Sequence, residues 1–322
     1  MHPQEVWNSP AWGPRLLRTA LIPASWLYAV GWQTYLATYR LGLKKAKEPH
    51  WPVVCIGNLQ VGGSGKSPLA LYVARRLFDL GHPAVMSLSG YGSPRSEDAS
   101  IAPEGPLRAA EWGDEPAMVR WLAPDIPLIV GRNRVSAARL AHERFPDRVL
   151  LMDDGFQHLP LKKHLTIVLD PREPPNRFCL PAGPYREPRG NRKRADLVMP
   201  GEFQIEALPS AIREPEGAEH RPDRYALLCA LGNPSGFAAA VTASLGRAPE
   251  AQLFLPDHDR MDAGTLWDRF PKSLDIVVSA KDWVKLRERP DVGERRILVA
   301  SHELFVNPRD EFDRRLETKL KR

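Results

Sequence analysis

The segment over residues 60–67 has the composition of a phosphate-binding loop. In such loops, glycines let backbone N–H groups turn toward phosphate oxygens, a lysine reaches the β- and γ-phosphates, and a hydroxyl binds Mg²⁺. Here Lys66 and Ser67 would take those last two roles, although Gln60 stands where the usual pattern begins with glycine. The spacing predicts a nucleotide-binding loop made of Gln60, Val61, Gly62, Gly63, Ser64, Gly65, Lys66 and Ser67.

Two adjacent acids follow a hydrophobic run over residues 149–152. This run predicts a buried strand that ends in Asp153 and Asp154, the place where P-loop proteins hold Mg²⁺ with an aspartate. Asp153 is the metal candidate, and Asp154 is expected to face the other side of the extended chain, toward the substrate. Paired aspartates also cap turns, so the sequence leaves that alternative open.

Three more charged residues lie at turns. Asp114 follows a glycine ahead of a predicted helix over 117–122, and His258 lies between two acids, where an Asp–His pair could orient a general base. Arg186, in the proline-rich loop over 180–188, could clamp a phosphate. Each residue also has a plainer interpretation. Asp114 could be an acid that stabilises a helix start, His258 a lone surface histidine, and Arg186 one partner of a surface ion pair with Glu187.

The elements that must position these residues alternate between strand and helix, which favours an α/β fold with a parallel, helix-covered sheet of the P-loop NTPase type. The apolar runs predict strands over 53–56, 84–88, 126–130, 149–152 and 165–169, with helices over 69–80 and 134–144. Residues 171–200 are expected to form a long functional loop, and residues 201–224 a polar connection.

A second α/β pattern begins at residue 225. It predicts strands over 225–230, 276–279 and 297–300, a helix over 237–244, and a C-terminal helix with an apolar stripe of Phe312, Leu316 and Leu320. We therefore predict an N-terminal helical segment over 1–46, a P-loop kinase domain over 47–205 and a smaller α/β domain over 206–322 that closes over the active-site cleft.

The N-terminal segment contains no charged side chain between residues 19 and 39 and has basic residues on both flanks. Its spacing places Tyr28, Trp32, Tyr35 and Tyr39 on one helix face. We interpret it as a helix at a membrane interface, with these aromatics at the boundary. A helix packed on the domain and a full membrane span are the alternatives.

Composition sets further limits on the class of protein. The chain has 322 residues, a net charge of +6 and three scattered cysteines. A positive net charge suits an anionic binding partner. The scattered cysteines indicate a protein of a reducing compartment that has neither a disulfide framework nor a zinc site.

Taken together, these motifs resemble those of the tetraacyldisaccharide 4'-kinase (lipid A 4'-kinase) family over nearly the whole chain. The residues that carry the resemblance are 26–28, 57–68, 90–92, 113–116, 130–132, 153–158, 180–188, 232–234, 256–258 and 281–282. That family also lacks glycine at the position of Gln60. Two positions depart from its pattern, since Ser89 replaces an arginine and Ala280 a glutamate, which puts any charge contact from them in doubt.

The resemblance implies ATP- and Mg²⁺-dependent phosphorylation of the 4'-hydroxyl of a tetraacylated disaccharide 1-phosphate, on the cytoplasmic face of the inner membrane. It implies no nucleic acid and no stable protein partner. It assigns Asp114 as the general base supported by His258, with Lys66 on the ATP. We keep Asp154 as the alternative base. Metal contacts are assigned to Ser67, Asp153 and Glu115, and substrate contacts to Arg186, Glu187, Gln157 and His158.

A competing interpretation is a membrane-tethered P-loop ATPase or GTPase switch that has no sugar-lipid acceptor. It accounts for the loop and the acidic strand end, but not for an Asp–His pair.

Overall fold

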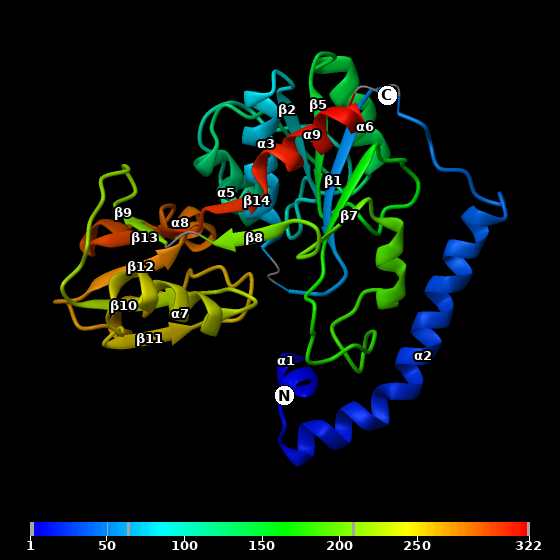
Figure 1. Cartoon of the computed structure of the whole chain (residues 1–322). Coiled ribbons are helices and arrows are strands. Elements are labelled where there is room, and N and C mark those ends of the chain that lie inside the picture. The colour runs from blue at the N-terminus through cyan, green and yellow to red at the C-terminus, as the bar shows by residue number, and fades with distance from the viewer. Residues whose placement is uncertain (1–2, 50, 63–64, 208–209, 321–322) are drawn as a thin grey trace. The chain divides into compact units, whose positions relative to one another are not determined.

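The computed structural model describes residues 3–49, 51–62, 65–207 and 210–320. These residues form two compact units, each assembled from separate stretches of the chain (Figure 1). The first unit comprises 1–66, 149–205 and 306–322, and the second comprises 67–148 and 206–305. The predicted domain boundaries at 46/47 and 205/206 stay a prediction.

The first unit is built on parallel strands in the order β5-β1-β6-β7. Their bounds are β1 Val53–Asn58, β5 Val149–Asp153, β6 Leu165–Leu169 and β7 Leu197–Met199. Every residue of β1, β5 and β6 is buried, as expected for a parallel sheet covered on both faces. The registers Ile56↔Asp153 and Asn58↔Leu169 bring the carboxyl ends of these strands to one edge, where a ligand site is expected.

The remaining elements of the first unit are helical. They are α1 Pro3–Asn8, α2 Trp12–Arg40, the 3-10 helix η1 Arg189–Arg194 and α9 Arg309–Leu320. The predicted stripe of α9 is confirmed, since Phe312, Leu316 and Leu320 are its buried residues. Over the described part of the chain, no helix combines the length and apolarity that crossing a membrane requires.

Helix α2 carries the four predicted boundary aromatics on one half-buried face. Tyr28, Trp32, Tyr35 and Tyr39 are half-buried beside the fully covered Ser25 and Leu36. Tyr28 packs against a cluster of buried side chains that includes Leu59 and Tyr185. Tyr28 therefore packs on the body of the unit, and the place of the four aromatics at a membrane boundary stays a prediction.

The second unit contains a group of three paired strands and a separate five-stranded sheet. In the group of three, β4 pairs in parallel with β2 and antiparallel with β3. The elements around it are α3 Lys66–Asp79, β2 Ala84–Leu88, β3 Ser100–Ile101, α4 Ala109–Trp112, α5 Asp114–Leu122, β4 Leu128–Val130 and α6 Arg134–Arg144. Lys66, the first residue of α3, belongs to the first unit, and the rest of the helix belongs to the second. The strand predicted from residue 126 begins two residues later, at Leu128.

The other sheet has the order β11-β10-β12-β13-β9, in which only β9 runs antiparallel to its neighbour. It confirms the predicted second α/β pattern. Its elements are β9 Ala211–Arg213, β10 Tyr225–Cys229, α7 Pro234–Leu245, β11 Ala251–Phe254, η2 Trp267–Arg269, β12 Asp275–Ser279, α8 Ala280–Leu286, η3 Val292–Glu294 and β13 Ile297–Ser301.

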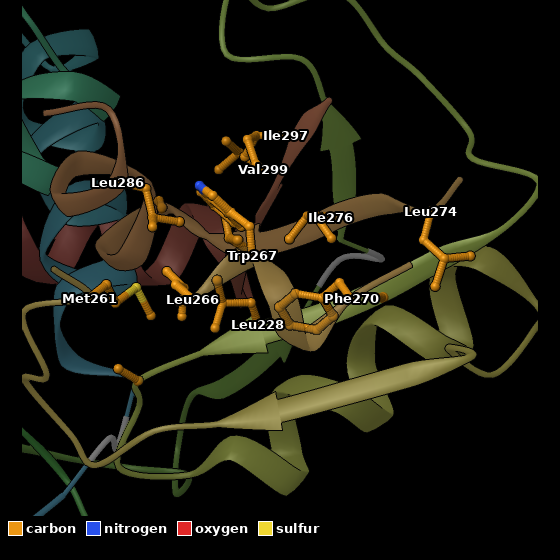
Figure 2. Packing of buried hydrophobic residues seen from close by; sticks show 14 residues of the cluster. Leu228, Met261, Leu266, Trp267, Phe270, Leu274, Ile276, Leu286, Ile297 and Val299 are labelled. Carbon is orange, nitrogen blue, oxygen red and sulfur yellow. The ribbon is translucent and has the colours of Figure 1, made fainter. Parts of the chain in front are cut away.

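The two faces of this sheet bury different partners, because successive strand residues point to opposite sides. Leu227, Val277 and Leu298 pack with Phe237 and Val241 of α7. The alternate residues pack on the other face with the 255–275 segment and α8, as Figure 2 shows for Leu228, Ile276 and Val299 around Trp267 and Phe270. This face also contacts the end of α5 and thereby supports the loop that carries His258.

Two segments predicted to lack regular structure contain short elements. The long loop over 171–200 includes η1 and β7, and the connection over 201–224 includes β9 and part of the two-stranded sheet formed by β8 Gln204–Ala207 and β14 Leu304–Asn307. These strands are only three or four residues long, so none of them leaves a long apolar run in the sequence.

Candidate active site

The predicted strand–loop–helix context of the phosphate-binding segment is confirmed. The buried strand β1 leads into the loop, and α3 begins at Lys66, with Pro68 in its first turn. Gly62 and Gly65 have φ angles of 108° and 77°, a region that favours glycine. The Asn58 amide donates to the Gln60 carbonyl at 2.6 Å. Gly63 and Ser64 lie outside the described residues.

The end of β5 supplies the first carboxylate cluster. Asp153 is the last residue of the strand and is 4% exposed, whereas Asp154 has a left-handed φ of 54°. The Asp154 carboxylate receives a hydrogen bond from Arg186 Nη1 at 2.8 Å on Oδ2, and Lys66 Nζ lies 3.7 Å from Oδ1. A carboxylate thus holds two cations beside the loop where phosphates are expected. We call Lys66, Asp154 and Arg186 the phosphate cluster.

Glu187 is held by hydrogen bonds from neighbouring side chains. Its fully buried carboxylate accepts hydrogen bonds from Gln157 at 3.1 Å, Asn191 at 2.9 Å and Arg194 at 2.5 Å. Gln157 also donates to the Asn58 carbonyl at 2.9 Å. Glu187 and Gln157 therefore tie the turn after β5 to the end of β1, and their substrate contacts stay a prediction.

His158 lies in the same turn after β5. Its backbone N–H donates to Gly155 at 3.1 Å, and its carbonyl accepts a hydrogen bond from the Lys163 ammonium. Burial lowers the pKa of Lys163. These contacts fix the backbone of the turn, and the predicted contact of the His158 side chain with the substrate stays a prediction.

The second cluster lies wholly in the second unit. Asp114, 7% exposed, begins α5 directly after Gly113, whose φ of 91° favours glycine at this position. The second-unit loop over 256–259 brings His258 Nδ1 to 2.9 Å from Asp114 Oδ2. Lys281 Nζ lies 3.7 Å from the same oxygen and 3.1 Å from Asp257 Oδ1. We call Asp114, His258, Lys281 and Asp257 the acid–base cluster.

The predicted Asp–His pair is thus brought together, and a lysine that we did not assign to the site joins it. Lys281 belongs to residues 281–282, one of the motifs that carry the family resemblance. That motif was the signal in the sequence that could have indicated a role for Lys281 in the site. The Tyr91 ring packs 5.3 Å from the His258 ring, between centroids, and holds it from another side. Ala280, by contrast, is buried in the apolar cluster of Figure 2, which suits a small side chain.

The contacts of His258 define its tautomer. A lysine ammonium has donors only, so its approach to His258 Nε2 at 3.4 Å makes Nε2 the acceptor in the neutral ring. Nδ1 then carries the hydrogen and donates to Asp114 Oδ2. His258 and Lys281 both lie on the Oδ2 side of the Asp114 carboxylate.

The pKa values of this cluster shift in opposite directions. Burial alone raises the pKa of Asp114, but the His258 hydrogen bond and the charge of Lys281 outweigh it, so the pKa lies below the ordinary value. The hydrogen bond to Asp114 raises the pKa of His258, against burial and the Lys281 charge. Burial lowers the pKa of Lys281, but Asp114 and Asp257 together raise it above its ordinary value. The cluster therefore favours the ionised form of Asp114 and the protonated form of His258.

The predicted metal ligands offer the donor types that Mg²⁺ prefers. Mg²⁺ usually binds through one or two carboxylates together with phosphate oxygens and water. The buried Asp153 carboxylate at the β5 end and the Ser67 hydroxyl in the first turn of α3 are hard oxygen donors of this kind. Within the described ranges, no three His, Cys, Asp or Glu side chains gather into a group that could hold a metal ion without such a phosphate. The metal roles of these residues and of Glu115 stay predictions.

The fold and the phosphate cluster define the class of P-loop nucleotide-binding α/β proteins. The sequence model of one family, LpxK (tetraacyldisaccharide-1-P 4'-kinase), matches residues 17–321. The chain belongs to this family, which confirms the resemblance drawn from its motifs.

Named relatives and a solved structure agree with this assignment. The chain is 37% identical to the tetraacyldisaccharide 4'-kinase of Anaeromyxobacter dehalogenans strain 2CP-C over 71% of this chain and 70% of the relative. It is 31% identical to that of Pelobacter propionicus over 91% and 90%, respectively. Its fold is similar to the crystal structure of the "apo" form of LpxK from Aquifex aeolicus in complex with ATP, with a TM-score of 0.80 at 25% identity, covering 94% of this chain and 99% of that chain.

Proposed function

We propose that this chain is an ATP- and Mg²⁺-dependent lipid kinase. It transfers the γ-phosphate of ATP to the 4'-hydroxyl of a tetraacyldisaccharide 1-phosphate and gives the 1,4'-bisphosphate of lipid A biosynthesis. Family membership over residues 17–321 supports the reaction. The observation that carries the proposal is the 2.9 Å pairing of Asp114 with His258, because an alcohol acceptor must lose a proton during transfer.

The phosphate cluster would bind and neutralise the triphosphate. Lys66 and Arg186 are both held on Asp154, so two cations are oriented before the nucleotide arrives. When bound, Mg²⁺ neutralises charge on the phosphates during transfer, and Ser67, Asp153 and Glu115 are the residues that would hold it. Orientation and charge neutralisation are the main contributions to phosphoryl transfer.

The acid–base cluster would activate the acceptor. The 4'-hydroxyl donates to the Asp114 carboxylate, the hydroxyl oxygen bonds to the γ-phosphorus, and the bond to the bridging β–γ oxygen breaks to leave ADP. The proton passes to Asp114 late in this step, because a carboxylate with a lowered pKa is a weak base. Neutral His258 supports the step by donating from Nδ1 to the ionised Asp114. Protonated His258 would stabilise the carboxylate further and make it a poorer base.

A transfer assay tests this function. We expect labelled γ-phosphate of ATP to appear on tetraacyldisaccharide 1-phosphate in detergent micelles. Lys66→Ala should lower kcat/KM for ATP by about 10²- to 10³-fold, because a charge-stabilising donor is lost. Exposed Lys272→Ala is the matched control and should resemble the wild type. Turnover that needs no acylated sugar, or a preference for GTP, would instead favour the P-loop switch.

Helix α2 is the element that we propose docks on the membrane surface. Its exposed large apolar side chains are Trp12, Leu16, Leu17, Trp26, Leu27 and Val30. Arg15 and Arg40 add exposed positive charge near its two ends, which suits anionic headgroups. The acylated substrate and the three buried cysteines, which form no disulfide with one another, support a place on the cytoplasmic face of the inner membrane.

Flotation with anionic phospholipid vesicles tests the docking. The double change Trp26→Ser and Leu27→Ser should reduce the floated fraction severalfold, because those side chains are 63% and 75% exposed. Phe78→Ser, which removes a 70% exposed side chain of α3, is the control. Equal loss in both variants would argue against docking through α2.

A further inference from the structure

Residues 179–186, which we call the bridging loop, pair with the first residues of the phosphate-binding segment. Val61 N–H donates to the Pro184 carbonyl at 2.8 Å, and Arg186 N–H donates to the Leu59 carbonyl at 2.7 Å. Gln60 and Tyr185 form an antiparallel bridge between these two bonds. The path of the phosphate-binding segment as it leaves β1 is therefore set by the bridging loop.

Helix α2 holds the bridging loop from the other side. The buried Ser25 hydroxyl donates to the Cys179 carbonyl at 2.7 Å and accepts from the Ala182 N–H at 2.9 Å. One turn later, the Tyr28 hydroxyl donates to the Arg186 carbonyl at 2.8 Å. Tyr28 thus bonds the backbone of the residue whose guanidinium binds Asp154.

A second chain of hydrogen bonds joins α2 to the same region. Gln33 donates to the Asn191 side chain at 3.1 Å, and Asn191 donates to Glu187 at 2.9 Å. Glu187 in turn accepts from Gln157, which donates to the Asn58 carbonyl. Both chains lie within the first unit, and both begin on α2 and end at the β1–loop junction.

From these contacts we infer that α2 is a positioning element for the nucleotide site, with Tyr28 as its main positioning residue. Tyr28 bonds the Arg186 carbonyl and not its guanidinium. It acts through the Arg186 backbone, and so through the orientation of Arg186 on Asp154 beside Lys66. This inference rests on the proposed function, because it concerns how the same chain binds ATP.

The hydroxyl of Tyr28 can be removed with little other change. Tyr28→Phe keeps the ring in its apolar cluster and leaves the exposed face of α2 intact. Tyr39→Phe is the matched control, because Tyr39 lies on the same half-buried helix face and its hydroxyl contacts only that of Tyr35, at 3.4 Å, among the hydrogen bonds described. The two variants lose the same atom at different distances from the bridging loop.

The test is titration of each full-length protein with ATP and Mg²⁺ by isothermal calorimetry, followed by steady-state kinetics. Tyr28→Phe should raise the Kd and KM for ATP by about 2- to 10-fold, the range for one neutral hydrogen bond. The KM for the lipid acceptor and the melting temperature should match those of Tyr39→Phe. In an Arg186→Ala background, Tyr28→Phe should add little, because the side chain through which it acts is gone.

The outcomes separate this inference from the proposed function. Equal ATP affinity in Tyr28→Phe and Tyr39→Phe would overturn it, as would a change confined to the acceptor KM. Full additivity with Arg186→Ala would overturn the route through Arg186. A wild type that binds ATP but phosphorylates no acylated disaccharide would refute the function alone, and a wild type that binds no ATP would refute both.

Discussion

The phosphate cluster and the acid–base cluster each place two basic side chains on one aspartate, but the types of these basic side chains differ. Asp154 is held by Lys66 and Arg186, and its side chain is 27% exposed. Asp114 is held by Lys281 and His258, and its side chain is only 8% exposed. One cluster therefore pairs its carboxylate with two permanent cations, whereas the other includes a histidine, whose charge can change.

This difference suits two kinds of chemistry. A site for a highly charged phosphate needs cations whose charge stays constant, and lysine and arginine provide it. A site that moves a proton needs a group whose charge can change. Each cluster also contains a residue in the left-handed region, Asp154 with a φ of 54° and His258 with a φ of 64°. Backbone strain of this type is often found at functional positions.

The largest expected effect distinguishes the two carboxylates. Asp114→Asn should lower kcat by about 10²- to 10⁴-fold with little change in the ATP KM, because a proton acceptor used only in the transition state is lost. Asp154→Asn should act mainly on the ATP KM, because it releases Lys66 and Arg186 from their shared anchor. Steady-state kinetics with both substrates varied would measure the two effects.

Asp262→Asn, which changes an exposed carboxylate elsewhere in the second unit, is the control for these variants. If Asp154→Asn proves the more damaging to kcat, Asp154 is the base and the roles of the two clusters must be exchanged.

A smaller effect concerns stability on the side of the phosphate cluster. A Cβ added at Gly57 would lie 2.5 Å from Phe156 Cβ, so the turn after β5 would have to shift. Gly57→Ala should destabilise the protein by about 1–3 kcal/mol, the range for overpacking, and should weaken ATP binding. Denaturant unfolding with and without ATP would measure both.

Gly190→Ala is the matched control, since a Cβ there meets nothing within 4 Å. Unchanged stability of Gly57→Ala would show that the close approach of β1 to this turn does not constrain the site.

The smallest effect is a pH shift confined to the acid–base cluster. Activity should rise with pH as His258 loses its proton, and the pKa of His258 lies above its ordinary value of about 6.5. Lys281 lowers that pKa and Asp257 raises it. The acidic limb of the kcat profile should therefore move to higher pH in Lys281→Met and to lower pH in Asp257→Asn.

His258→Asn should abolish this limb, since asparagine tolerates the left-handed conformation but does not titrate. Shifts of the same sign in Lys281→Met and Asp257→Asn would contradict the assignment of the limb to His258.

Much of the phosphate side could be predicted from residues close in sequence. The apolar run of β1, the glycines and the periodicity of α3 predict strand, loop and helix, because local propensity and burial agree there. The three-residue strand β9 was missed for the opposite reason, since its place is fixed by pairing with β13 and by one buried residue, Ile212.

The Asp114–His258 pair shows the limit of reasoning from the residues alone. The two are separated by 144 positions, and only the family resemblance linked them before the structure did. Nothing local indicated that Lys281 would neutralise the same carboxylate, or that Glu187 would be saturated by neighbours such as Arg194. Such contacts depend on the packing of distant elements.

By itself, the sequence determined the class of fold and the phosphate-binding loop, because alternating apolar runs and a glycine-rich turn act over short stretches of chain. Only the tertiary structure decided which carboxylate each cation holds, which nitrogen of His258 carries the hydrogen, and which face of α2 packs on the protein. Those properties depend on distances of a few ångströms between atoms far apart in the chain, and such distances are fixed only when the core is packed.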